Sequence, residues 1–524
     1  MGSPAKRITI ICLAILFLAA LPGCSVADMD WTFSPPTESD RIFDQASPTA
    51  VTYPLTDAAG LSMLLADPEA GELLAASTDY TGIPLSVDFV SSGELNEQLE
   101  ALLAAGDLPD LLYPYDETMS FTVRPGLAAA VLDLTDYVMD CAPNYLAAMG
   151  QNEILKDHLL DDGEVNTFYQ LSTGAAPTDY GPWIRSDWLA EQGLELPRTY
   201  EEYGAVLQAF HNAYGCTDTL LLPGYGAVQG NYLAAGLGAA AWVQGGDYSS
   251  LGFYIQDGTV KYGPMEPAFW DYVTLLHSWY EQGLISPDFM YSSPRTALLG
   301  AQTGILYLTT GEAANYQAIT GDGSGVLVPI PDAVVAEGDS LHLSQDSKTL
   351  VQRATFYIPA SCQDPALAVR WCDFWYTEEG GLLLNWGVEG ESYTLDESGQ
   401  PVYTDAVLQA SGSRSRRSPY LCDLLPGVLD LDLYRYWLDA PALAASDLWT
   451  AGRDSDWVIS ADLALSDQDA ERFSTMILAI QTHTTSITDQ LITGAFGLDQ
   501  RETFLAQLRD LGIDKCIACL QAYQ

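Results

Sequence analysis

Three tryptophans in this sequence lie beside charged or polar side chains, in surroundings rich in glycine or proline that are typical of loops. An indole ring offers an apolar face that matches the C–H face of a sugar ring, while carboxylate, amide and guanidinium groups bind sugar hydroxyls. Packing in a core is the alternative for any one ring, and the helical spacing of Trp371 and Trp375 favours it for that pair. The candidate ligand-binding residues selected on this basis are Trp183, Arg185, Trp242, Trp386 and Glu389.

Motifs that would indicate catalysis or a bound cofactor are missing or incomplete. Residues 236–241 (GLGAAA) imitate a dinucleotide-binding fingerprint, but no β-branched strand precedes them, as that fingerprint requires. The sequence has no P-loop, HExxH or GxSxG motif, its five histidines are scattered, and carboxylate pairs arise by chance among 70 acids. We therefore predict no enzyme, no catalytic residue, no metal site and no cofactor. This argument from local motifs does not address catalytic groups that lie far apart in the sequence and meet only in the folded chain.

Seven cysteines follow Cys24, an odd number that cannot pair completely within one chain. Cys516 and Cys519 form a single CxxC motif with no second CxxC and no nearby histidine, so the sequence does not predict a zinc site. Because they lie in a helix-like segment, we expect buried thiols at these two positions.

The chain is short of cations rather than crowded with charge. Its 524 residues include 21 Lys and Arg against 70 Asp and Glu, which gives a formal net charge of −49. Nucleic-acid binding needs many phosphate-neutralising cations, and adhesion to anionic lipid needs a basic face, so the composition argues against both functions. With 48% hydrophobic residues, the chain can still bury a substantial core.

The N-terminus has the features of an export signal followed by a lipid attachment site. A short basic segment precedes an apolar run over 8–20, which is too short to span a bilayer. The Leu-Pro-Gly-Cys sequence that ends at Cys24 resembles a bacterial lipobox, in which the cysteine is lipidated. We predict a signal peptide over 1–23, a lipidated Cys24 and a flexible tether over 24–50, on the extracellular side of the cell membrane. An ordinary signal peptide with a chance cysteine is the alternative.

The elements that must position the candidate residues alternate between strands and helices. Residues 84–90 alternate like a strand, 94–105 place leucines on one helical face, and 111–113 form a short buried strand. This β–α–β pattern predicts an α/β fold. Further helices are expected over 200–214, 266–283, 365–376 and 501–511, and a further strand over 304–308.

Blocks of sequence from about residue 80 to the C-terminus match one family pattern. Residues 183–203 (WIRSDWLAEQGLELPRTYEEY) fit (Y/W)IRxDWLxxxGLxxPxTxxEF. Further blocks, in the family's order, are 104–110 (AAGDLPD), 257–264 (DGTVKYGP), 280–289 (YEQGLISPDF) and 387–393 (GVEGESY). The chain thus resembles the extracellular solute-binding proteins of family 1, the carbohydrate-type binding lipoproteins of ABC importers, especially their LipO/LplA-like branch.

This resemblance implies an α/β fold of the periplasmic-binding-protein type (type II). Two lobes, each with a mixed sheet flanked by helices, are joined at a hinge and hold the ligand in the cleft between them. We expect one lobe to comprise 51–176 plus 300–360, and the other 177–299 plus 361–524.

Position within that fold adds three candidates. Tyr113, Tyr115 and Asp116 follow the second strand and are expected to face the cleft. Asp187 and Trp188 are expected to be structural instead, the first near a helix N-terminus and the second in the core.

The function that the resemblance implies is capture of a carbohydrate, an oligosaccharide, by a lipid-anchored monomer that delivers it to ABC permease subunits. The alternatives are an exported glycan-active enzyme and a non-transport sensor or adhesion lipoprotein with the same fold. The ligand itself stays open between a sugar, a cationic solute and a peptide, because the chain is so acidic.

Overall fold

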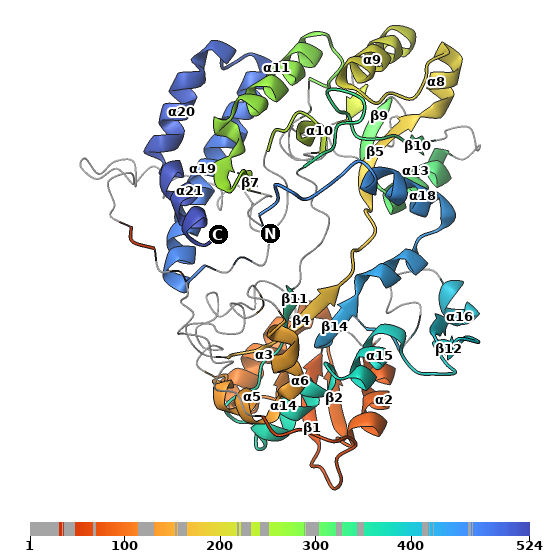
Figure 1. The fold of residues 1–524 in the computed structure, drawn as a ribbon, viewed down its shortest axis with the longest axis vertical. Helices are drawn as coiled ribbons and strands as arrows, with labels where there is room; N and C mark the ends of the chain where they lie inside the picture. The colour runs from red at the N-terminus through yellow and green to blue at the C-terminus, as the bar shows by residue number, and fades with distance from the viewer. Residues whose placement is uncertain are drawn as a thin grey trace.

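A computed structural model shows two lobes of strands and helices, one above the other in Figure 1, so the predicted two-lobed α/β architecture is confirmed. The residues that the structure describes are 31–33, 35, 48–65, 70–113, 130–151, 155, 165–216, 219–221, 232–240, 251–287, 289, 303–320, 327–342, 351–410, 418, 420–422, 424–459, 463 and 465–524. Within them, no helix combines the length and the apolar character needed to cross a membrane. The predicted signal peptide and Cys24 lie outside these residues.

The lower lobe in Figure 1 begins with a parallel sheet. Its central strand β1 (Leu61–Leu65) pairs with β2 (Leu85–Phe89) on one side and β3 (Leu111–Leu112) on the other. The other elements of this lobe, apart from a second sheet considered below, are α2 (Gly71–Thr81), α3 (Ser92–Ala105), α5 (Thr135–Cys141), α6 (Pro143–Met149), α14 (Pro365–Phe374), α15 (Glu378–Trp386), β12 (Tyr393–Leu395), β13 (Pro401–Tyr403), α16 (Asp405–Leu408) and η8 (Leu431–Trp437).

The upper lobe is built on a four-stranded mixed sheet in the order β10-β5-β9-β6. These strands are β10 (Leu327–Pro329), β5 (Tyr180–Arg185), β9 (Ile305–Thr309) and β6 (Leu220–Leu221). The other elements of this lobe are α8 (Ser186–Gln192), α9 (Tyr200–Tyr214), α10 (Tyr232–Ala235), β7 (Phe253–Gln256), β8 (Thr259–Tyr262), η6 (Gly263–Met265), α11 (Pro267–Glu281), α13 (Thr310–Thr320), α18 (Ala440–Thr450), α19 (Asp467–Thr493), η9 (Leu498–Gln500), α20 (Arg501–Asp510) and α21 (Ile513–Ala522).

The predicted elements agree with these bounds to within two residues at each end. Helix α9 shows why: the Thr199 side chain accepts a hydrogen bond from the backbone of Glu202, whose carboxylate in turn accepts from the backbone of Thr199. This capping box fixes the first turn of the helix. At the C-terminus Cys516 and Cys519 are buried in α21, and no disulfide forms among the seven described cysteines, so the predicted thiols are confirmed.

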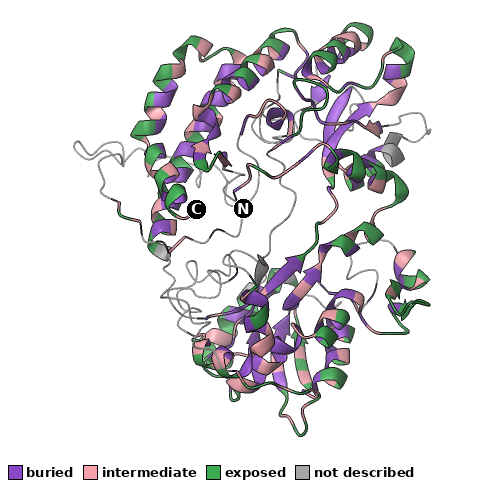
Figure 2. Cartoon of the chain, in the orientation of Figure 1, coloured by how far each residue is buried: buried purple, intermediate pink, exposed green. Residues whose placement is uncertain are grey.

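The hydrophobic cores correct the predicted lobe boundaries. Figure 2 shows the buried residues concentrated around the sheets of each lobe. Strand β9 packs in the upper core beside Ile184, whereas Phe356 and Trp371 pack in the lower core beside Phe168. The expected assignment of 300–360 to the first lobe and of all of 361–524 to the second is therefore wrong. The described residues of 303–342 belong with the upper lobe, and the described residues of 351–437 belong with the lower one.

Part of the predicted flexible tether is bound to the folded protein. The Trp31 indole N–H donates a 2.6 Å hydrogen bond to the carboxylate of Asp469, and Trp31 and Phe33 pack against the upper core. Asp469 is buried and also accepts from the Tyr523 hydroxyl at 2.7 Å. Around Trp31 to Phe33, the segment that we expected to be free is an ordered contact of the upper lobe.

One buried carboxylate makes the stability of the lower lobe depend on pH. Burial raises the pKa of Asp373 from its ordinary value to about 6, although its carboxylate accepts hydrogen bonds from the backbone N–H groups of Asn144 and Tyr145, both at 2.8 Å. Because the folded state binds this proton more tightly than the unfolded state does, the contribution is fully present below the unfolded pKa of 3.8 and is lost as the pH rises through about 6.

We expect the free energy of unfolding of Asp373→Asn to lack this dependence. Relative to the variant, the wild-type protein should gain about 2 kcal/mol as the pH falls from 7 to 4. Urea titrations of both proteins across this range measure the difference, and a parallel pair of curves would contradict the expectation.

Candidate functional site

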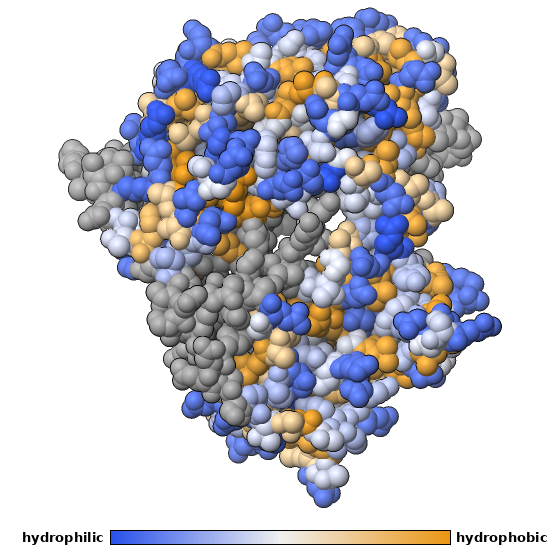
Figure 3. Space-filling model, in the orientation of Figure 1, coloured by the Kyte–Doolittle hydropathy of each residue, from blue (hydrophilic) through white to orange (hydrophobic). Residues whose placement is uncertain are grey.

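Beyond β3, the described part of the chain crosses between the lobes three times, and all three crossings meet one sheet of the lower lobe. In this sheet β4 (Phe168–Thr173) lies between β11 (Val351–Phe356), which is antiparallel to it, and β14 (Gly427–Asp430), which is parallel. The chain leaves for the upper lobe at the ends of β4 and β14, and it returns at the start of β11. All three crossings therefore leave the same end of the sheet, which is the arrangement of a hinge. Figure 3 shows the surface hollowed between the upper and lower lobes.

The first crossing is hydrogen-bonded to both elements of the third connection, η8 in the lower lobe and α18 in the upper lobe. The backbone N–H of Ala175 donates to the Asp432 carboxylate at 3.1 Å, and the hydroxyls of Thr178 and Thr450 lie 3.0 Å apart. Gly174 adopts φ +72°, and a Cβ there would lie 2.8 Å from the Asp432 side chain. The first and third crossings are thus joined to each other, and a glycine is required where they meet.

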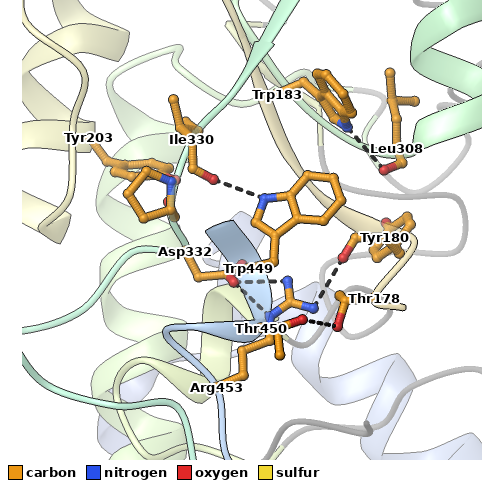
Figure 4. A network of polar contacts seen from close by, with 11 residues as sticks. Thr178, Tyr180, Trp183, Tyr203, Leu308, Ile330, Asp332, Trp449, Thr450 and Arg453 are labelled. Atoms are coloured by element: carbon orange, nitrogen blue, oxygen red, sulfur yellow. Dashed lines mark hydrogen bonds and ion pairs between the residues drawn. The ribbon is translucent and has the colours of Figure 1, made fainter. Parts of the chain in front are cut away.

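At the upper end of the hinge lies a buried ion pair (Figure 4). The Nε atom of Arg453 donates to Asp332 Oδ2 at 2.8 Å, and the two side chains are 0% and 3% exposed. Arg453 also donates to the backbone carbonyl of Tyr180 at 3.1 Å, at the point where β5 begins. The guanidinium thus joins three segments: the start of β5, the turn after β10 and the end of α18.

Aromatic rings enclose this cation. Its guanidinium carbon lies 3.8 Å from the centroid of the Tyr232 ring and 5.9 Å from that of Trp449. Tyr180 lies 6.0 Å from Tyr232, and burial raises the pKa of its phenol well above the ordinary value. Stacked contacts of this kind stabilise a desolvated guanidinium by about 2 kcal/mol. A pocket of about 210 Å³ opens beside the pair; its lining includes Arg198, Asp332 and Trp449.

Trp183 lies next to this network but does not present a free ring. It is 4% exposed, its indole N–H donates to the carbonyl of Leu308 at 3.2 Å, and its ring contacts Trp449 edge to face at 5.5 Å. The expected loop context is also wrong, because Trp183 belongs to β5, a central strand of the upper sheet. In this conformation the residue is part of the core.

Arg185 is held by its sequence neighbours. Its guanidinium makes two hydrogen bonds to the carboxylate of Asp187, one of them 2.7 Å from Nε, and lies 4.6 Å from the ring centroid of Trp188. The hydrogen bond to Asp187 raises the pKa of Arg185. Asp187 and the buried Trp188 have the structural positions that we expected, in the first turn of α8 and in the core.

Trp386 and Glu389 lie in the lower lobe. Trp386 ends α15, so its loop context is wrong too, and its half-buried ring lies 4.5 Å from Tyr403 and 6.3 Å from Tyr436 of η8. Glu389 is exposed. Trp386 thus packs against the segment that leads to the third crossing.

The remaining candidates divide between the core and the residues that are not described. Tyr113 is 4% exposed and packs in the lower core, with its ring 5.7 Å from Phe356. Tyr115, Asp116 and Trp242 lie outside the described residues. The structure therefore places Trp183 close to the hinge network, the group of Arg453, Asp332, Tyr180, Tyr232 and Trp449. Tyr113 lies in a different core. Ligand contact by all eight candidates stays a prediction.

Sequence reasoning missed the residues that build the hinge network. Trp449 and Arg453 are four positions apart in a chain that has only 21 cations. A scarce cation at helical spacing from a tryptophan could have indicated a contact between the two side chains. Asp332 gave no signal, because nothing in the sequence places it opposite Arg453.

The comparisons with known proteins agree on one family. Residues 67–382, more than half of the chain, match the family described as bacterial extracellular solute-binding protein. Lipoprotein LipO of Bacillus subtilis (strain 168) is 23% identical over 342 residues, 62% of this chain and 64% of that protein. The fructooligosaccharide ABC transporter substrate-binding protein FusA of Streptococcus pneumoniae serotype 4 is 23% identical over 373 residues, 65% of each chain. The chain thus matches slightly less than two thirds of the length of these relatives.

Solved structures agree on the fold. Alginate-binding protein AlgQ2, crystallised without calcium ion, has a TM-score of 0.62 at 19% identity and covers 91% of this chain and 99% of its own. A solute-binding protein from Bifidobacterium longum infantis, described as binding HMO, has a TM-score of 0.64 at 17% identity, with 89% and 98% covered. FusA in complex with kestose has a TM-score of 0.62 at 16% identity, with 88% and 98% covered. At these identities the likeness establishes the fold, and with the family match it shows that this chain belongs to the bacterial extracellular solute-binding proteins.

Proposed function

We propose that this protein is a lipid-anchored binding protein of an ABC importer that captures an oligosaccharide between its lobes and delivers it to the permease. The observation that carries the proposal is the hinge: three crossings leave one sheet end, and two of them are bonded together. Such a connection lets the lobes close as rigid bodies around a solute. Family membership and the sugar-binding relatives favour a carbohydrate as that solute.

The charge of the chain favours a neutral oligosaccharide over an acidic one. Binding an anionic glycan needs cations, and the formal net charge is −49. Two arginines near the hinge are already paired, Arg185 with Asp187 and Arg453 with Asp332. Neutral sugars need aromatic faces and hydrogen-bonding groups instead, which this chain supplies with 12 Trp and 29 Tyr.

Calorimetry and thermal unfolding with a glycan panel test the proposal. The panel contains kestose-type fructo-oligosaccharides, neutral milk-type oligosaccharides, alginate and galacturonate oligomers, and a basic peptide. We expect saturable binding of a neutral oligosaccharide, with a gain of about 2.7 kcal/mol in the free energy of unfolding at a ligand concentration of 100 Kd. Binding of the peptide alone, flat responses throughout, or turnover of any glycan would overturn it.

Lipid anchoring has a separate test. We expect Cys24→Ser to release the protein from the membrane fraction into the medium without changing its sugar affinity. Retention of the variant in the membrane would contradict the anchor and leave the binding function standing.

The hinge glycine gives a sharper test of closure. Gly174→Ala places a Cβ against Asp432 in left-handed backbone, so we expect a loss of about 1–3 kcal/mol in unfolding free energy together with altered sugar affinity. Gly193→Ala is the matched control, because Gly193 has φ +64° with nothing within 4 Å of the added Cβ. The control should be destabilised but bind sugar normally. Equal affinities for the two variants would mean that Gly174 plays no part in closure.

A further inference from the structure

We propose that His342, Asp454 and Asp456 form a binding site for a divalent transition-metal ion on the upper lobe. Each of the three side chains offers one donor atom, and these atoms lie within 4.8 Å of one another. His342 Nδ1 is 2.9 Å from one carboxylate oxygen of Asp454 and 3.0 Å from the other. Three donors this close can share one ion at bond lengths of about 2.0–2.2 Å after small side-chain rotations.

The backbone brings these side chains together from two distant segments. The N–H of Asp454 donates to the carbonyl of Leu341 at 2.9 Å, and the N–H of Trp457 donates to the carbonyl of His342 at 3.1 Å. The N–H of Asp456 donates to the Asp454 carboxylate at 3.2 Å, which folds 454–456 into a turn. This pairing orients the three donors before an ion binds, and such preorganisation lowers the entropic cost of binding.

Aromatic packing fixes the imidazole. The ring centroid of His342 lies 4.8 Å from that of Trp457, and Trp457 in turn stacks on Tyr254 at 5.7 Å. His342 and Asp454 are about one-third exposed, at 38% and 33%, so an ion can reach them from solvent. The indole also provides an optical reporter next to the site.

Charge favours a cation at this position. Arg453 precedes Asp454 in sequence but points into the protein, where Asp332 neutralises it. Within the described residues, the ion pair that the structure gives Asp454 is the one with His342. With a neutral imidazole the cluster carries two negative charges, in a chain whose formal net charge is −49.

The donor set selects the kind of ion. One imidazole and two carboxylates suit Zn²⁺, Co²⁺ or Ni²⁺, and three protein ligands leave further positions to water. Calcium takes six to eight oxygen ligands, and an imidazole nitrogen is a poor substitute for one of them.

A bound ion would connect two crossings of the hinge on their upper side. His342 lies on the stretch that leads from β10 to β11, and Asp454 and Asp456 follow α18, which receives the third crossing. The ion would therefore stabilise the upper lobe where both segments enter it. This role does not depend on which solute the cleft holds.

Zinc titration of the full-length protein after EDTA treatment tests the site. We expect one Zn²⁺ per chain by calorimetry in the presence of excess Ca²⁺ and Mg²⁺, a rise in Tm on binding, and quenching of tryptophan fluorescence by Ni²⁺. His342→Ala and Asp456→Asn should each weaken the Zn²⁺ affinity at least about tenfold. A single cooperative unfolding transition of each variant in EDTA shows that it folds.

His483→Ala is the control, because that imidazole lies on α19 beside Gln507 and outside the cluster. It should keep the one-to-one site and the Ni²⁺ quenching. Zn²⁺ binding no tighter than Ca²⁺ binding, or unchanged Zn²⁺ affinity in both cluster variants, would show an ordinary His342–Asp454 ion pair and overturn the proposal.

Discussion

Replacing Arg453 by methionine is expected to lower the free energy of unfolding by about 3–5 kcal/mol, because it leaves the buried Asp332 carboxylate without its counter-charge. The second oxygen of Asp332 has no hydrogen-bond partner, so no other group compensates for the loss. The carbonyl of Tyr180 also loses its arginine donor at the start of β5. Urea unfolding at pH 7 measures the effect. Removing both charges, in Arg453→Met with Asp332→Leu, should restore part of the stability, since replacing a whole buried pair costs less than breaking it.

Arg435 provides the matched control. It forms an ion pair with Asp447 at 2.9 Å, but both side chains are exposed, at 44% and 58%. Exposed pairs of this kind contribute about 0–1 kcal/mol. If Arg453→Met costs no more than Arg435→Met, then the buried network is not what holds the upper end of the hinge together.

Much of the fold follows from local signals in the sequence. Helix α9 has both a capping box at Thr199 and an apolar stripe, so the residue at which it begins and the spacing of its apolar residues both indicate the same helix. The β2–α3–β3 unit has strands and a helix of ordinary length with a turn between them. Lobe membership does not follow from such signals, because it is decided by pairings over long distances. Strand β11 pairs with β4 across about 180 residues, and β9 pairs with β5 across about 120.

The site was harder to predict because tryptophan, glycine and arginine occur both in ligand-binding loops and in packed cores. Gly181 and Pro182 make the surroundings of Trp183 look like a loop, yet they belong to a central strand. The partner that shows this, Trp449, lies 266 residues away in sequence, in α18. Arg185, by contrast, could have been recognised as paired, because Asp187 is two residues further on. A scarce cation is therefore informative only once its nearest carboxylates have been considered.

Gly181→Ala is the second large effect that we expect. A Cβ at this position would lie 2.2 Å from a ring carbon of Trp449, closer than atoms can approach. The indole cannot easily move aside, because its N–H donates to the carbonyl of Ile330 at 3.0 Å and its ring contacts Trp183 edge to face. Overpacking of this kind costs about 1–3 kcal/mol and more where the neighbours are fixed, so we expect at least 3 kcal/mol by urea unfolding.

A double-mutant cycle separates this clash from a general intolerance of β5. Trp449→Leu is itself destabilising, but it removes the ring that the new Cβ meets, so Gly181→Ala should cost much less in that background. Gly311→Ala is the control: Gly311 is exposed in α13, nothing lies within 4 Å of its added Cβ, and alanine there should stabilise the helix by about 0.5–1 kcal/mol. Equal costs of Gly181→Ala in both backgrounds would show that the strand backbone, and not the tryptophan packed on it, requires the glycine. The expected coupling would instead mean that Gly181 is needed to seat Trp449 beside Arg453, which makes a residue of β5, the strand that follows the first crossing, part of the support for the third crossing.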